Sequence, residues 1–278
     1  MIDTHAHLNF NNFKDNSKDI IKDCLYRNIR IINIGSQYET SRRAVQMAVE
    51  YEKGVYAAIG IHPIHLSQME IDEEDAHFKS RAEKFDKSRY IELLSKKVIA
   101  IGEIGLDYFH IPDDMDFEAV KKIQKKEFIA QLKFAKETNL PVILHCRGNK
   151  NNPFEAYGEI LEIIQDQGNL RGVIHCFGAN LEIAKKFLDL GFYIGFTGII
   201  TFKNALSELV ETVKKIPLDR ILIETDCPYL APMPHRGELC VPQYAEFTLR
   251  KMAEIKGISF EEAEKQTDKN ADKLFGIQ

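Results

Sequence analysis

The chain has 278 residues, of which 44% are hydrophobic and 28% charged, and its formal net charge at pH 7 is −5. This composition is typical of a soluble globular protein and excludes disordered and fibrous classes. The negative charge argues against broad nonspecific coating of nucleic acid, although a local basic patch remains compatible with it.

Neither the start of the chain nor its apolar runs predict a targeting or membrane segment. The first residues lack the basic and apolar regions of a signal peptide, and no apolar run approaches the roughly 20 residues that span a bilayer. The five cysteines are odd in number and widely spaced, which is typical of reduced thiols in an intracellular protein. We therefore expect a cytoplasmic protein, with nuclear or organellar placement left open, no membrane association and no obligate protein partner.

Short apolar runs alternate with amphipathic stretches along the whole chain. The predicted strands are Met1–Ala6, Ile29–Ile34, Val55–Ile61, Val98–Ile104, Pro141–Cys146, Gly172–Phe177, Phe192–Phe196 and Ile221–Thr225. The clearest helical patterns are Phe117–Thr138, Ala179–Leu190, Pro242–Lys256 and Ser259–Phe275.

Eight buried strands alternating with helices predict an α/β fold, a closed (β/α)8 TIM barrel, in preference to an open doubly wound sheet. The longest connection, residues 64–97, is predicted to be a helical insertion after the third strand. No low-complexity linker, charge block or repeat divides the chain, so we expect residues 1–278 to form a single TIM-barrel domain.

Potential metal ligands fall at or just after the carboxyl ends of the predicted strands. In a TIM barrel that end of every strand faces the active site. These residues are His5, His7, His62, Glu103, His145, His175 and Asp226.

His5 and His7 share one strand face, because side chains two residues apart in a strand point the same way. They could reach one metal ion, or they could be two surface histidines near a terminus. Glu103 lies inside an apolar run, where a charge is costly to bury unless it is paired or bound to a metal. Its two oxygens could bridge two cations, and the alternatives are a solvent-facing carboxylate or a structural ion pair.

His145 and His175 each follow an apolar strand. A single histidine there is more often a hydrogen-bonded structural residue, but two at equivalent strand ends beside Glu103 favour metal binding. Asp226 could be a ligand, a general base, or both. Glu224 shares its strand face and could lie deeper in the barrel as the partner that orients a metal-bound histidine.

Four imidazoles and two carboxylates exceed the three protein ligands that a catalytic zinc usually takes. The set suits two divalent metal ions some 3.5–4 Å apart, with Asp226 accepting a proton from water. Such mixed ligands fit Zn, Mn or Fe, and Mg is compatible with the carboxylates. Cys146, Cys176 and Cys227 are expected to face away from the ligands, as small buried side chains.

Nine sequence segments occur in a fixed order from residue 2 to residue 276. They are IDTHAHL, GIHP, IGEIGLDY, LHCR, HCF, GFTGIITFKNA, ETDCPYLAP, HRG and NADKLFG. Together they resemble the TatD family of metal-dependent deoxyribonucleases, in the amidohydrolase superfamily. The resemblance implies a TIM barrel with a two-metal site.

The resemblance also implies roles for individual residues. One ion would be held by His5, His7, Glu103 and Asp226, and the other by Glu103, His145 and His175, with Glu103 bridging. His62, Arg147 and Arg236 would lie near the substrate phosphate. For the two arginines the alternative is an ordinary solvated side chain.

Three loop positions depart from the family pattern. Ile64 stands where a histidine is frequent, Gly178-Ala179 replace a common Ser-Gly, and Cys240 takes the place of an Asn before a proline. These departures bear on substrate preference rather than on metal binding.

The leading hypothesis is a deoxyribonuclease that cleaves phosphodiester bonds of DNA from an end of single-stranded or frayed DNA, with Glu103 and Asp226 as catalytic residues. The first alternative keeps the metal site but takes a small ester, lactone or amide as substrate. The second is a barrel that binds without catalysis, which would require a lost ligand.

Overall fold

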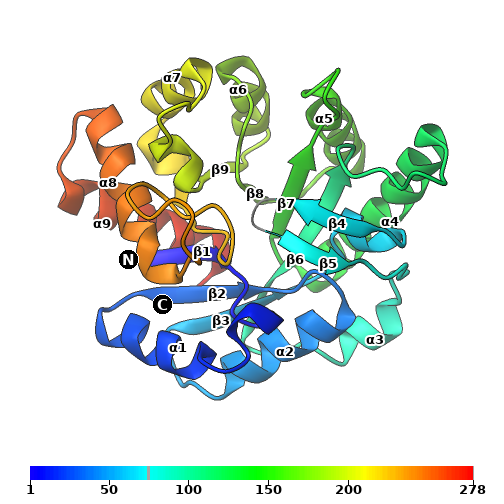
Figure 1. The fold of residues 1–278 in the computed structure, drawn as a ribbon, viewed down its shortest axis with the longest axis horizontal. Helices are drawn as coiled ribbons and strands as arrows, with labels where there is room; N and C mark the ends of the chain where they lie inside the picture. The colour runs from blue at the N-terminus through cyan, green and yellow to red at the C-terminus, as the bar shows by residue number, and fades with distance from the viewer. Residues whose placement is uncertain (74–75, 278) are drawn as a thin grey trace.

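The computed structural model describes residues 1–73 and 76–277. Its main sheet has eight parallel strands in the order β1-β2-β3-β6-β7-β8-β9-β10 (Figure 1). Their bounds are β1 Ile2–Ala6, β2 Arg30–Ile34, β3 Val55–Ile59, β6 Val98–Asp107, β7 Val142–Arg147, β8 Gly172–Ile174, β9 Tyr193–Phe196 and β10 Ile221–Ile223.

The sheet closes between its first strand and the segment that follows its last one. The Asp226 N–H donates to the His5 carbonyl at 2.9 Å, and the His7 N–H donates to the Cys227 carbonyl at 2.9 Å. Ala6 and Cys227 form a parallel bridge between these two bonds. The predicted barrel is therefore confirmed, and its closure holds His5, His7 and Asp226 next to one another.

Helices surround the barrel on its outer side (Figure 1). Their bounds are α1 Ser17–Tyr26, α2 Tyr38–Val49, α3 Lys87–Ile91, α4 Phe117–Thr138, α5 Glu155–Gln167, α6 Leu181–Asp189, α7 Ser207–Lys215, α8 Ala245–Lys256 and α9 Phe260–Phe275. Short 3-10 segments are η1 Asn11–Phe13, η2 Pro63–Leu66, η3 Gly198–Thr201, η4 Leu218–Arg220 and η5 Pro242–Tyr244. Among the described residues, no helix has both the length and the apolar composition needed to cross a bilayer.

Local sequence signals explain where the longest helix begins and ends. The Asp116 carboxylate accepts the N–H of Ala119 at 3.1 Å and caps the first turn of α4. Asn139 adopts a left-handed φ of 53°, which is a frequent way for a helix to end. The bounds predicted for α4 are confirmed.

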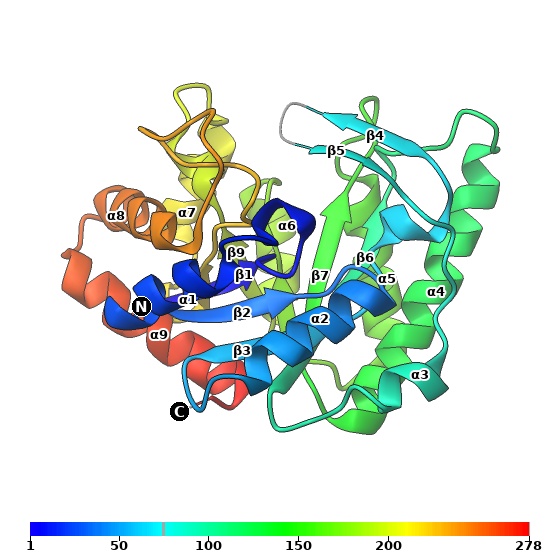
Figure 2. The ribbon, with the colours of Figure 1, turned by 60° about the horizontal axis from the view of Figure 1, so that its bottom comes forward.

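The insertion between β3 and β6 differs from the prediction. Its main element is an antiparallel hairpin of β4 Glu70–Glu73 and β5 Ala76–Lys79, and only η2 and the five-residue α3 are helical. Ile71 pairs with Phe78 across the hairpin. Figure 2 shows the hairpin at the end of the molecule toward which the barrel strands point. The insertion therefore stands over the mouth of the barrel, where the candidate ligands lie.

Candidate metal centre

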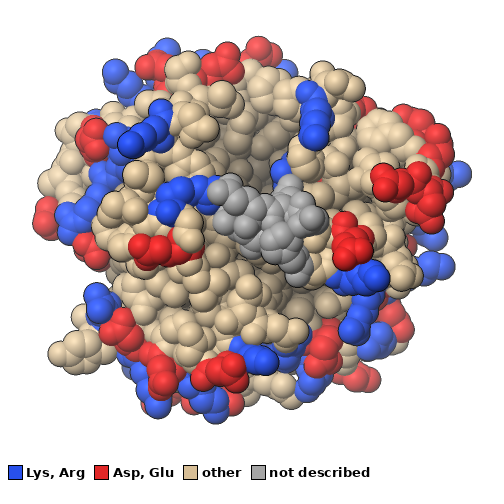
Figure 3. All heavy atoms as spheres, viewed as in Figure 1, with Lys and Arg blue, Asp and Glu red and all other residues tan. Residues whose placement is uncertain are grey.

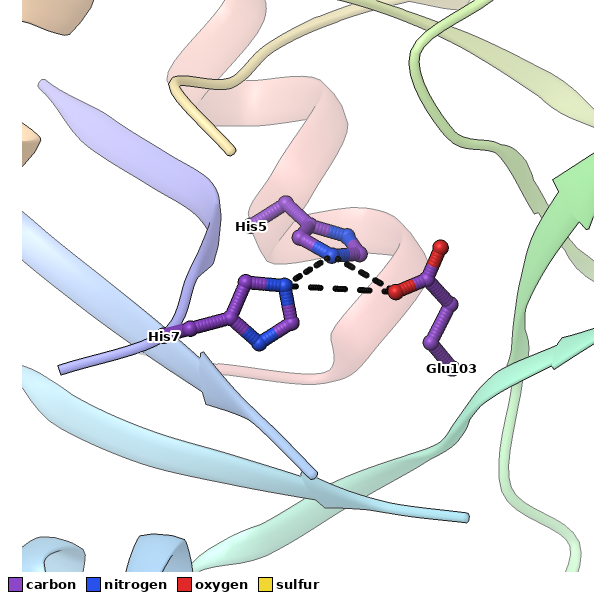
Figure 4. Close-up of side chains that lie close together, drawn as sticks. All are labelled: His5, His7 and Glu103. Carbon is purple, nitrogen blue, oxygen red and sulfur yellow. Dashed lines mark hydrogen bonds and ion pairs between the residues drawn. The ribbon is translucent and has the colours of Figure 1, made fainter. Parts of the chain in front are cut away.

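Glu103 lies at the centre of the candidate site. Its side chain belongs to β6 and the residue is only 4% exposed. Its Oε2 atom lies 3.3 Å from Nε2 of His5 and 3.9 Å from Nε2 of His7 (Figure 4). The two imidazole nitrogens are themselves 3.2 Å apart. They therefore point at one small volume beside a carboxylate oxygen, as two ligands of one cation do.

The other oxygen of Glu103 faces a different group of imidazoles. Oε1 lies 3.0 Å from Nδ1 of His145, 3.9 Å from Nε2 of His175 and 3.7 Å from Nε2 of His62. Burial raises the pKa of Glu103, but the surrounding imidazoles outweigh it and hold the pKa well below the usual range. An ionised carboxylate with its oxygens divided between two nitrogen clusters is suited to bridging two cations.

Asp226 completes the site from the other side of the barrel closure. Its Oδ1 atom lies 3.3 Å from Nε2 of His7, 3.6 Å from Nε2 of His5 and 3.5 Å from Nε2 of His175. The backbone of Asp226 has a φ of 64°, which is uncommon for a residue other than glycine. Its hydrogen bond to the His5 carbonyl holds it there, so the closure also aims the carboxylate.

Two of the histidines have one ring nitrogen fixed by an acceptor. Nδ1 of His7 lies 2.9 Å from the Ile34 carbonyl, and Nδ1 of His175 lies 2.7 Å from Oε2 of Glu224. A carbonyl or carboxylate oxygen only accepts, so Nδ1 carries the proton in each neutral ring. The lone pair of Nε2 then faces Glu103 or Asp226, which is the arrangement that a metal ligand needs.

The Glu224 carboxylate is fully buried beneath the site. It fits there because β9 has Gly195 beside it: a Cβ atom at this position would lie 2.3 Å from Oε1 of Glu224. Burial lowers the pKa of His175, but Glu224 and Asp226 outweigh it and raise the pKa well above its usual range. The carboxylates around His175 therefore strongly favour a positively charged group at this point of the site.

Asp107 is a functional candidate that the sequence analysis did not identify. Its Oδ2 atom lies 3.0 Å from Nε2 of His145, and its Oδ1 accepts the N–H groups of Phe109 and His110. Asp107 therefore holds His145 as Glu224 holds His175. The predicted strand ended at Ile104, whereas β6 continues to Asp107. Extending the alternation from Glu103 by four residues would have placed Asp107 on the same face.

His62 turns a hydrogen-bond donor toward the site, whereas His7 and His175 turn a nitrogen lone pair toward it. Its Nδ1 atom accepts the N–H of Ile64 at 3.1 Å. Burial, followed by the neighbouring His145, lowers the pKa of His62 well below its usual range, so the ring is neutral. Its Nε2 therefore carries the hydrogen and acts as a donor, which fits an anion contact better than a metal ligand.

A cavity of about 710 Å³ opens at the barrel mouth. Its wall contains the sequence-predicted residues His7, His62, Glu103, His145, Arg147, His175, Asp226 and Arg236. His5 is fully buried and lies outside this lining. Figure 3 shows this face hollowed beside the residues drawn in grey, with basic and acidic side chains around it.

The two predicted arginines lie at the cavity with their guanidinium groups over aromatic rings. The Arg147 guanidinium carbon lies 3.9 Å from the centre of the Phe109 ring, and that of Arg236 lies 4.8 Å from the centre of the Phe202 ring. Stacking of this kind fixes the guanidinium plane. Both arginines are thus brought to the site with restricted orientations.

One cysteine differs from the expectation. Cys176 lines the cavity and is only partly buried, with its Sγ 3.3 Å from Oγ1 of Thr197. The strand alternation does not reach it, because β8 ends at Ile174 and Cys176 has a φ of 45°. Burial raises its pKa to about 11, so the thiol is neutral near pH 7. Cys146 is buried but also contributes to the lining, and Cys227 is fully buried as expected.

Two of the three departures from the expected loop pattern reach the cavity. Ile64 and Gly178 are lining residues. Cys240 is fully buried and lies outside the lining.

Known proteins match this chain along its whole length. The family model described as "TatD related DNase" matches residues 2–276. The chain is 38% identical to the uncharacterized metal-dependent hydrolase YabD of Bacillus subtilis, with 100% of this chain and 99% of that protein covered. It is 32% identical to the uncharacterized metal-dependent hydrolase YcfH of Escherichia coli, with 100% and 96% covered.

Solved structures of TatD family proteins also resemble this chain. The structure of YJJV, a TatD homologue from Escherichia coli K12, superposes with a TM-score of 0.79 at 28% identity and covers 100% of this chain and 98% of that one. A hydrolase of the TatD family from Entamoeba histolytica shares the fold with a TM-score of 0.74 at 22% identity, covering 99% and 97%.

Proposed function

The chain belongs to the family of TatD related DNases and is a metal-dependent hydrolase, and on this premise we propose that it cleaves phosphodiester bonds of DNA at two divalent metal ions. The observation that carries the proposal is the division of the Glu103 oxygens: Oε2 faces His5 and His7, whereas Oε1 faces His145 and His175. The substrate is proposed to be an end of single-stranded or frayed DNA.

The proposed ligand sets use the nitrogen and oxygen atoms that face one another in the site. His5, His7, Glu103 and Asp226 would hold one ion, and Glu103, His145 and His175 the other. When bound, Mg²⁺, Mn²⁺ or Zn²⁺ ions supply Lewis acidity at the phosphate and lower the pKa of water. Glu224 and Asp107 keep His175 and His145 in place, because each carboxylate lies within 3.0 Å of a ring nitrogen.

Asp226 is the proposed general base. Burial raises its pKa, but His175 and the other imidazoles around it outweigh burial and keep the pKa below the usual range. The carboxylate is therefore ionised at neutral pH and can accept a proton. Its side chain is 16% exposed, which leaves it accessible from the cavity. It would take the proton of the attacking water while His62 donates its Nε2 hydrogen to a phosphate oxygen.

Arg147 and Arg236 would bind the phosphate from the cavity wall. Their positions over Phe109 and Phe202 hold the guanidinium groups at the mouth. A guanidinium pairs with two phosphate oxygens at once, which fixes the orientation of the diester.

The test is hydrolysis of labelled single-stranded DNA by purified protein with Mg²⁺, Mn²⁺ or Zn²⁺. Asp226→Asn should lower kcat by about 10²–10⁴-fold, the usual contribution of a general base. Asp189→Asn is the matched control, because Asp189 is an exposed carboxylate at the end of α6. Equal activity of the wild type and Asp226→Asn would assign the cleavage to a contaminant and refute the proposal.

The same assay should include RNA, double-stranded DNA and small carboxylic esters, lactones and amides. Hydrolysis of a small ester or amide without any cleavage of DNA would transfer the site to the alternative substrate class and refute the nuclease proposal.

A further inference from the structure

We propose that a second basin beside the metal centre binds the part of a single-stranded nucleic acid that continues beyond the scissile phosphate. This inference rests on the proposed nuclease function and adds a binding site to it. We call this cavity the side basin. Its described lining is Phe10, Asn11, Asn12, Ser36, Gln37, Tyr38, Glu39, Thr40, Arg43, His65, Phe78, Lys79, Arg81, Glu83, Arg89 and Tyr229.

The side basin adjoins the central cavity. Its volume is about 560 Å³, and it shares the lining residues Phe10, Ser36, His65, Phe78 and Tyr229 with the central cavity. The ring of Phe10 stacks on that of His7 with their centres 4.3 Å apart. A chain leaving the metal centre on its His7 side would therefore enter the side basin directly.

The charged groups of the side basin favour a polyanion. Arg43, Lys79, Arg81 and Arg89 line it, against two acidic residues, Glu39 and Glu83. Both acidic residues already have partners.

Arg42 lowers the pKa of Glu39 most, and the basin residues Arg43 and Arg89 lower it too, yet four basic residues line the basin against two acidic ones. Glu39 accepts from Nε of Arg42, which lies outside the lining, at 3.0 Å. Oε1 of Glu83 accepts the backbone N–H of Tyr38 at 3.1 Å. Arg43 donates from Nη1 to Oδ1 of Asn11 at 3.1 Å, and its buried Nε has no hydrogen-bond partner among the described residues. Phosphate groups would supply the acceptors that these basic side chains can use.

Aromatic rings stand among these basic groups. The Arg89 guanidinium carbon lies 3.8 Å from the centre of the Tyr38 ring, and Phe10, Phe78 and Tyr229 are partly exposed in the walls. Basic side chains that follow the backbone, combined with aromatic faces for bases, are the usual features of single-strand binding. A free phosphate would use only the first of these features.

His65 adds a polar atom at the junction of the two cavities. The residue is 6% exposed and lines both cavities, and within the described part of the chain its Nδ1 atom has no hydrogen-bond partner. An unpartnered buried polar atom costs free energy that a hydrogen bond would recover. A base edge or a phosphate passing between the cavities would supply that bond.

The strand order indicates the path of the bound chain. The side basin is built from the loops after β1 and β2 and from the insertion after β3, whereas Arg147 ends β7. In the closed order of eight strands, β7 is the fifth position and lies across the barrel from β1. A strand held by Arg147 on one side and by the side basin on the other would cross the metal centre between them.

Substitution of Arg81 tests the inference, because this side chain is exposed and lies in the basin wall. Binding of a labelled single strand of about 12 nucleotides is measured by fluorescence anisotropy on metal-free protein in EDTA. Arg81→Ala should weaken binding and lower the slope of log K against log[salt] by about 0.7 for the lost phosphate contact. Arg81→Glu should weaken binding further, and Arg81→Lys should restore most of it.

Arg250→Ala is the matched control, because Arg250 is an exposed arginine of α8 whose carboxylate partner is Glu246 and which lies outside both linings. It should bind as the wild type does. If Arg81→Ala and Arg81→Glu also bind with wild-type affinity and salt dependence, the side basin does not hold the strand and the inference is overturned.

A second measurement separates this inference from the proposed function. The kcat/KM for oligonucleotides of increasing length is compared with that for bis(4-nitrophenyl) phosphate, which is too short to reach both cavities. The kcat/KM of the wild type should rise with oligonucleotide length, and that of Arg81→Ala should not. Cleavage by the wild type without any gain with length would refute the side basin alone. Cleavage of no phosphodiester with any metal would refute the nuclease proposal and the side basin together.

Discussion

Glu224 does not line the cavity, yet it orients the candidate ligand His175. Its Oε2 lies 2.7 Å from Nδ1 of His175. We expect Glu224→Gln to weaken binding of Mn²⁺ by roughly 10–100-fold, the usual effect of losing such a partner. Isothermal titration calorimetry on the metal-free protein measures the Mn²⁺ affinity.

The control for this substitution is Glu162→Gln, on the exposed side of α5. A wild-type Mn²⁺ affinity in Glu224→Gln would show that His175 does not depend on this carboxylate, or that His175 is not a ligand.

His65 should make the stability of the protein sensitive to acid. Burial lowers its pKa to about 4, against about 6.5 in an unfolded chain. The folded state therefore binds fewer protons between these values, so stability present above about pH 6.5 is lost as the pH falls toward 4.

His65→Gln removes this contribution. Urea denaturation at about pH 7 and about pH 5 should show that the variant loses roughly 2 kcal/mol less than the wild type between the two values. Equal losses in the two proteins would mean that His65 is protonated in the folded state as easily as in the unfolded one.

At the residue scale, the sequence predicted the candidate ligands because each lies at or just after the carboxyl end of an apolar strand. The proposed sets were His5, His7, Glu103, His145, His175 and Asp226, and the structure brings all of them together. Asp107 was missed because the end of β6 was placed three residues too early. The orientation of Cys176 could not be predicted, because its positive φ interrupts the strand alternation.

At the scale of the element, β9 leaves space at Gly195 for the side chain of Glu224, which follows the neighbouring strand β10. A Cβ atom at Gly195 would lie 2.3 Å from Oε1 of Glu224. We expect Gly195→Ala to displace that carboxylate and to lower Mn²⁺ affinity as Glu224→Gln does. The measurement is the same calorimetric titration, supported by thermal unfolding.

Gly158→Ala is the comparison, because Gly158 lies within α5 and a Cβ there would meet nothing within 4 Å. It should retain metal affinity and stabilise the protein by about 0.5–1 kcal/mol, since glycine is a poor helix former. A wild-type affinity in Gly195→Ala would contradict the close packing of β9 against Glu224.

Element types were predictable where the periodicity was long, as in α4. The main element of the insertion was not predictable, because the pairing of Ile71 with Phe78 joins two strands of only four residues each. A short stretch of this length does not distinguish a strand from a helix by its periodicity. The insertion was predicted as a connection of the right length with the wrong main element.

At the scale of the whole molecule, barrel closure and the candidate site depend on the same residues. The buried Asp3 carboxylate of β1 accepts the N–H of Thr225 at 3.0 Å and its hydroxyl at 2.6 Å. Thr225→Val removes the hydroxyl and leaves a buried carboxylate short of one donor. We expect the free energy of unfolding to fall by about 1–3 kcal/mol, measured by urea denaturation.

Thr212→Val is the matched control. Thr212 is equally buried, but its hydroxyl donates to the Glu208 carbonyl within α7. Loss of that bond leaves no buried carboxyl group short of a donor, so the cost should be smaller than that of Thr225→Val. A larger cost for Thr212→Val would contradict the role assigned to the Asp3–Thr225 pair in closing the barrel.

The central claim is that Glu103 bridges two divalent ions, and anomalous diffraction from crystals soaked in Mn²⁺ tests it most directly. We expect two anomalous peaks about 3.5–4 Å apart, one on each side of the Glu103 carboxylate, with both peaks weakened in Glu103→Ala crystals. A single peak at saturating Mn²⁺, or two peaks of unchanged height in Glu103→Ala, would contradict the claim.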